Sequence, residues 1–151
     1  ERLRLTMRPV SSIGHWSGRQ PFGAPSHAAP STAPSEQVPD DAPMASITRA
    51  RIRPGQLRAF WRSVPDVASA LSQADGLLWS MGIGEAPIGL QGTFSLWRDA
   101  AAIRRFAYES DGHRQAITRT RETQWFAEEL FARLTVLDVD GTIDGAPLQV
   151  T

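Results

Sequence analysis

Hydrophobic and polar residues alternate at the start of the chain. Leu3, Leu5 and Met7 fall on one side of an extended backbone, and the residues between them are Arg and Thr. This period of two predicts a strand over residues 3–7. Pro9 is expected to end it, because proline cannot donate to a sheet ladder. A strand that opens a chain needs a partner, and because no neighbouring segment offers one, it is expected to be an orphan strand.

A second run of patterned segments begins in the middle third of the chain. Residues 45–52 alternate and predict a strand. Residues 57–71 carry apolar side chains at helical spacing, and Pro65 is expected to kink this helix or to start a second one. Residues 77–84 and 89–97 then predict two strands that form a hairpin.

The last third of the chain adds a helix and a strand. Asp99 is expected to cap a helix that breaks at a Ser-Asp-Gly triplet and resumes over residues 113–123. Residues 131–136 predict the final strand, followed by turns at Asp140-Gly141 and Asp144-Gly145. The resulting order, β-α-β-β-α-β, is that of a ferredoxin-like α+β domain with an antiparallel sheet and both helices on one face.

The segment between the first strand and this domain has a different composition. Residues 21–43 contain six prolines among 23 residues and are otherwise mostly Ala, Ser and Asp. This composition predicts an extended linker. The helix-free face of the predicted sheet needs a cover, which could be a second copy of the domain in the same chain or a partner chain, as in a homodimer.

Composition excludes several classes of protein. The 151 residues suit one domain, and the chain has neither cysteine nor lysine. Disulfides, thiolate metal sites, Schiff-base chemistry and a P-loop lysine are therefore excluded. The 16 basic and 16 acidic residues argue against a nucleic-acid partner. No apolar run is long enough to predict a transmembrane helix.

Two histidines are candidates for chemistry. His113 opens a helical segment beside Ala116 and Ile117, so its imidazole could serve as an axial ligand of haem iron, or simply bond to backbone. His15 lies with Trp16 and Arg19 in a glycine-rich loop that could bind a propionate, or be an ordinary loop.

Other candidates are weaker. Glu85 could be a general base or a solvated turn residue. The adjacent Glu128 and Glu129 are expected to point in different directions and so not to form a catalytic pair. The tryptophans at positions 61, 79 and 97 are expected to lie in the core or in the wall of a pocket.

Four long segments resemble one enzyme family. These are GIGEAPIGLQGTFSLW (82–97), FAYESDGHRQAITRTRETQWFAEELFARLTVL (106–137), TRARIRPGQLRAFWRSVPDV (48–67) and SSIGHWSGRQPF (11–22). They resemble the spheroidene monooxygenases, which are acyclic carotenoid 2-ketolases. The resemblance covers nearly the whole chain apart from the proline-rich linker.

The resemblance implies a fold of two tandem ferredoxin-like halves of the dimeric α/β-barrel type. Residues 1–20 would be the last strand and loop of a truncated first half, residues 21–43 the linker, and residues 44–151 the second half. It also implies an enzyme that uses haem b, O2 and reduced ferredoxin. The substrate would be spheroidene or a related acyclic carotene, oxidised at carbon 2 to a hydroxyl and then a ketone.

The resemblance also bears on the candidate residues. It favours His113 as the iron ligand, because His113 is the only histidine in the matching helix, with His15 as the alternative. Arg114 and Arg19 are expected to pair with haem propionates, by charge. The implied protein is cytoplasmic, with peripheral contact to the membrane that holds the carotenoid. A non-catalytic small-ligand binding domain and a haem oxygenase for another apolar substrate are the alternatives.

Overall fold

The computed structural model describes residues 2–23, 41–85, 90–109, 125–143 and 145–147. Its strands are β1 (Leu3–Gly14), β2 (Met44–Ile52), β3 (Leu77–Glu85), β4 (Leu90–Trp97), β5 (Phe126–Ile143) and β6 (Ala146–Pro147). Its helices are η1 (Pro54–Gln56), α1 (Leu57–Ser72) and α2 (Ala100–Glu109). The helix predicted over residues 113–123 and most of the predicted linker lie outside the described residues.

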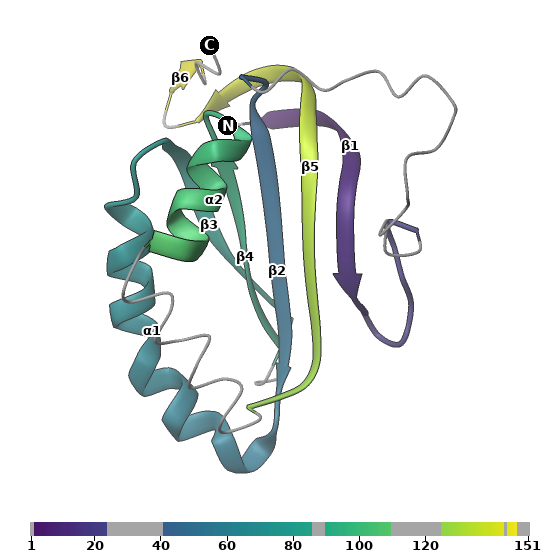
Figure 1. Cartoon of the computed structure of the whole chain (residues 1–151), viewed down its shortest axis with the longest axis vertical. Helices are drawn as coiled ribbons and strands as arrows, with labels where there is room; N and C mark the ends of the chain where they lie inside the picture. Colours follow the sequence, from purple (N-terminus) through teal and green to yellow (C-terminus); the bar gives the residue numbers. More distant parts are fainter. Residues whose placement is uncertain (1, 24–40, 86–89, 110–124, 144, 148–151) are drawn as a thin grey trace.

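The order β2-α1-β3-β4-α2-β5 confirms the predicted ferredoxin-like unit. Its strands lie in the order β5-β2-β4-β3, and each pairs antiparallel with its neighbours. Each helix therefore connects two strands that run in the same direction, with a third strand between them. Figure 1 shows both helices on the same face of the sheet, as predicted.

The first strand corrects two expectations. β1 pairs antiparallel with β5, from Leu3 opposite Gly141 to Gly14 opposite Leu130. Its partner therefore comes from the far end of the chain (Figure 1). Pro9 does not end the strand. It lies on an edge strand, at a shift in the register of the ladder, where a missing N–H donor is tolerated.

β5 is longer than predicted. Asp140 and Gly141, interpreted from the sequence as a turn, lie inside a strand that continues to Ile143. Gly141 has a φ of 110°, and a Cβ at this position would collide with the carbonyl oxygen of Arg2. The N–H of Thr142 donates to that same carbonyl at 3.1 Å. Glycine therefore allows the end of β5 to approach the start of β1 closely.

The helices differ from the predictions in one respect and agree in another. α1 is one helix with Pro65 inside it, so Pro65 does not start a second helix. Trp61 is 47% exposed, which excludes the core, one of the two places expected for it. α2 begins as predicted, because the N–H of Ala102 donates to Asp99 Oδ1 at 2.6 Å. This hydrogen bond is the main reason that the pKa of Asp99 is below its ordinary value.

One apolar cluster lies between the helices and the sheet. Its buried members are Met44, Trp97, Ala102 and Ile103. Trp97 is 1% exposed, and its Nε1–H donates to Ser95 Oγ at 2.9 Å and to Ser46 Oγ at 3.3 Å. The two serine hydroxyls are 2.8 Å apart and bond to each other. The indole N–H of Trp97 and the two serine hydroxyls, all buried on this face, therefore satisfy one another.

A second cluster lies on the opposite face of the sheet, which we call the open face. Its buried members are Ala45, Leu96, Ala132, Leu134 and Val136. Leu5, Met7, Phe22, Ile47, Leu78, Trp79, Phe94 and Val139 pack against them and are partly exposed. Met81, which pairs with Phe94, is 45% exposed. Within the described part of the chain, both helices lie on the other side, so this apolar face has no helical cover (Figure 1).

Candidate functional site

Two charged residues interrupt the open face toward one end of β2. Because side chains alternate along a strand, Arg49 shares a face with Ala45 and Ile47. Glu128 lies on that face of β5, two positions before Leu130, the residue that pairs with Arg49. Arg49 Nη1 donates to Glu128 Oε1 at 3.0 Å, and the exposed fractions of the two side chains are 3% and 18%. A largely buried ion pair therefore lies where the apolar part of this face ends, before the exposed Arg51.

The Glu128 carboxylate also holds the turn that follows β1. Trp16 and Arg19 close this turn through backbone hydrogen bonds of 2.8 and 3.0 Å. Ser17 and Gly18, between them, have φ values of 51° and 71°, as in a type I′ hairpin turn. Their N–H groups each donate to one oxygen of Glu128 at 2.8 Å. Residues that are far apart in the sequence are thus joined at one carboxylate.

Trp16 adds a third contact to this arrangement. The Arg49 guanidinium carbon lies 4.6 Å from the centre of the Trp16 ring, within the range of a cation–π interaction. The N–H of Gly18 is the largest cause of a lowered pKa at Glu128, and the contacts from Ser17 and Arg49 act in the same direction against the effect of burial. Glu128 is therefore ionised at neutral pH and accepts all three hydrogen bonds as a carboxylate.

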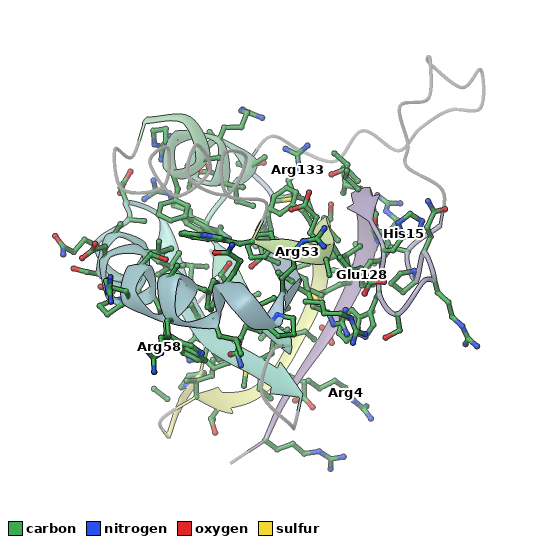
Figure 2. The ribbon with its side chains drawn as sticks, turned by 90° about the horizontal axis from the view of Figure 1, so that it is seen from below. Arg4, His15, Arg53, Arg58, Glu128 and Arg133 are labelled. Carbon is green, nitrogen blue, oxygen red and sulfur yellow. The ribbon has the colours of Figure 1, made fainter. Side chains whose placement is uncertain are left out.

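His15 and Arg19, two of the predicted cofactor-binding residues, flank this turn. The backbone N–H of His15 donates to the carbonyl oxygen of Glu129 at 2.8 Å. Both side chains are exposed, and Figure 2 shows His15 and Glu128 on the same side of the molecule, beside the end of β1. Among the described residues, neither side chain has a hydrogen-bond partner. The backbone at His15 is therefore fixed while its imidazole remains available.

The other two predicted residues, His113 and Arg114, lie outside the described residues, as does the glutamate side chain at position 85. Within the described ranges, no group of three or more His, Asp or Glu side chains could hold a metal ion. The same ranges contain no helix that is both long and apolar enough to cross a membrane.

Sequence reasoning missed Arg49 and the role of Glu128. Glu128 and Glu129 point to opposite faces of the sheet, as predicted. That orientation rules out a catalytic pair, but it places Glu128 in the site. A usable signal was present. In the strand at 45–52, Arg49 occupies the same phase as the apolar residues Ala45 and Ile47, a position where an unpaired charge would be costly.

Solved structures show which class of fold this is. A protein from Fusobacterium nucleatum, proposed to be a monooxygenase, matches with a TM-score of 0.60 and 16% identity, over 68% of this chain and 46% of that one. A proposed antibiotic biosynthesis monooxygenase from Caulobacter crescentus CB15 matches with a TM-score of 0.54 and 13% identity, over 66% and 93%. At these identities the likeness establishes the fold, a ferredoxin-like α+β sheet.

Curated relatives place the chain more narrowly. Spheroidene monooxygenase from Rhodobacter capsulatus is 39% identical over 142 residues, which are 94% of this chain and 56% of that protein. The proteins of the same name from Cereibacter sphaeroides and Rubrivivax gelatinosus are 32% and 34% identical, over 96% and 91% of this chain. No protein-family model matches. The chain is related in sequence to the spheroidene monooxygenases, as predicted, and spans about half the length of these relatives.

Proposed function

We propose that this chain forms one ferredoxin-like half of a monooxygenase that acts on an acyclic carotenoid. The observation that carries the proposal is the match to three spheroidene monooxygenases over more than nine-tenths of the chain. The open face supports it, because a hydrocarbon chain needs an apolar surface from which water is excluded. Trp79, Met81 and Phe94 supply such a surface and are partly exposed.

In this proposal the open face binds and orients the carotenoid and keeps water from it. The reaction adds oxygen at carbon 2 of spheroidene or a related carotene, giving a hydroxyl and then a ketone. Haem b, when bound, supplies the activation of O2 with electrons from reduced ferredoxin. Because the substrate is held in lipid, the protein is expected to contact the membrane peripherally.

The proposed cofactor ligands come from this chain. His113 is the first candidate for the iron ligand and His15 the second, and Arg114 and Arg19 are the proposed partners of the propionates. The exposed imidazole of His15 has no hydrogen-bond partner among the described residues, and an imidazole nitrogen suits haem iron. His15 therefore fits the group by donor type and availability.

We also propose that β1 belongs to a preceding ferredoxin-like half. Relatives about twice as long leave room for such a half. β1 is an addition to the edge of a complete βαββαβ unit, antiparallel to its last strand. Two related halves arranged about a twofold axis bring equivalent last strands together in this antiparallel manner.

An absorption spectrum of the full-length protein, purified with haem supplied, tests the proposal. The protein's turnover of spheroidene, with O2 and with reduced ferredoxin as the electron donor, is the second measurement. A Soret band that is lost in His113→Ala, and product that carries oxygen at carbon 2, are the expected results. A band lost only in His15→Ala moves the ligand to that residue. A folded protein that shows neither a band nor turnover would favour a ligand-binding domain without catalysis.

A further inference from the structure

We infer that Arg49 and Glu128 are positioning residues, which hold the His15–Arg19 turn in place as one wall of the ligand site on the open face. The inference rests on the proposed function, since it names how one end of that site is built.

The Arg49–Glu128 ion pair is costly to bury. Transferring two charges from water into a largely buried position is expensive, and a well-packed apolar pair is often as stable or more so. Ile47 and Leu130 adjoin Arg49 on this face and are apolar, whereas the next residue on the face, Arg51, is exposed. An Arg–Glu pair at this point therefore does something that apolar packing could not do as well, such as fixing a specific geometry.

The ion pair holds the turn that follows β1. The Glu128 carboxylate accepts from the consecutive N–H groups of Ser17 and Gly18 and from Arg49, so the turn has one position relative to the sheet. Trp16 lies over the Arg49 guanidinium. Three bonds to one carboxylate, together with a stacked ring, define the turn more tightly than packing alone would.

The turn is connected to the open face through Phe22. The chain continues from the turn to Phe22, which packs against the apolar cluster of that face. The segment therefore extends from the ion pair onto the apolar surface and borders it. A hydrocarbon bound on the open face would meet this segment, so its affinity depends on whether the segment is ordered in advance.

The test compares Glu128→Gln with the matched control Glu129→Gln in the full-length protein. The control changes the neighbouring carboxylate on the opposite face of the same strand, which is exposed. Spheroidene in detergent micelles is the probe, and quenching of tryptophan fluorescence measures its affinity. We expect Glu128→Gln to weaken binding by about ten-fold or more. The free energy of ordering the turn is then subtracted from the free energy of binding. Glu129→Gln should leave the affinity unchanged.

Two further readouts separate positioning from a purely structural role. The amide protons of Ser17 and Gly18 should lose the downfield shifts of carboxylate-bound groups in Glu128→Gln and keep them in Glu129→Gln. In turnover, KM should rise while kcat stays close to that of the unsubstituted protein. Should Glu128→Gln not fold, Arg49→Lys, which keeps the charge and loses the planar guanidinium, is expected to show the same weakening to a smaller degree.

The outcomes are distinct. Unchanged affinity in Glu128→Gln, with the amide shifts lost, would overturn the inference and leave the network as a structural clamp. Equal weakening in Glu129→Gln would overturn it too, because the effect would then follow charge alone. Failure of the unsubstituted protein to bind spheroidene would overturn the proposed function, and with it this inference.

Discussion

The apolar residues on the two faces of the sheet are covered to different extents. On the helix side, Trp97 is enclosed by α2 and by its bonds to two buried serines. On the open face, the central residues are equally buried, yet the surrounding aromatic and aliphatic side chains remain partly exposed. One face is thus complete within the described part of the chain, and the other presents its apolar surface outward.

The difference also extends to the polar groups. The helix side buries neutral hydroxyls that bond to one another, whereas the open face buries a charged pair that reaches out to a turn. Neutral groups buried in satisfied pairs add to stability. A buried ion pair contributes less to stability and more to a defined geometry. Both faces therefore contribute buried apolar residues to folding, and the open face is also where binding is expected.

The largest effect should come from Trp97→Ala. Removing this ring leaves a cavity and two hydroxyls without their donor, so we expect a loss of about 3–5 kcal/mol in the free energy of unfolding. Urea denaturation followed by circular dichroism measures it. Trp61→Ala, at a ring that is 47% exposed, is the matched control and should cost far less. Equal losses in the two variants would contradict the enclosed position of Trp97 on the helix side.

Glu128→Gln should have the next largest effect and a characteristic pH dependence. The pKa of Glu128 is lowered in the folded state, mainly by the N–H of Gly18, relative to its ordinary value of 4.5. Its contribution is then fully present above pH 4.5 and is lost as the pH falls through the lowered pKa. We expect a loss of about 1–3 kcal/mol at neutral pH.

Urea titrations across this range measure that dependence. The stability difference between Glu128→Gln and the unsubstituted protein should narrow steadily as the solution is made more acid than pH 4.5. A difference that stays constant with pH would mean that the carboxylate charge has no part in holding the turn.

Asp99→Ala tests the helix side with a smaller change. It removes the N-cap of α2 and should cost about 1 kcal/mol. Asp75→Ala is the control, because that carboxylate is 75% exposed and its ion pairs with Arg98 and Arg105 lie at the surface. Surface pairs of this kind contribute about 0–1 kcal/mol. Thermal unfolding should therefore rank Asp99→Ala as the less stable variant, and the reverse order would be inconsistent with a capped helix.

The smallest effect on stability is expected from Met81→Gln on the open face. Met81 is 45% exposed, so its replacement should change the free energy of unfolding by about 0.5 kcal/mol or less. Spheroidene binding should nevertheless weaken, whereas Trp61→Gln on α1, equally exposed, should leave it unchanged. If both variants bind as the unsubstituted protein does, the open face is not the ligand surface.

Local signals were sufficient for the ferredoxin-like unit. Periods of 2 and 3.6 placed its strands and helices, and Asp99 identified the start of α2 correctly. They predicted the start of β1 but not its end or its partner, because the pairing of Leu3 with Gly141 leaves no trace in either local sequence. The site was not predicted from local signals for the same reason. Arg49 and Glu128 each match an ordinary charged strand residue, and only the register between β2 and β5 brings them together.

The pairing of β1 with β5 has a consequence for synthesis on the ribosome. β1 is translated before every strand of the ferredoxin-like unit, and its partner β5 is the last strand of that unit to be translated. At typical translation rates the delay is on the order of ten seconds, during which the nascent β1 must remain soluble without its partner. For the same reason, a shortened gene that begins at β2 would leave the outer edge of β5 uncovered and prone to aggregation.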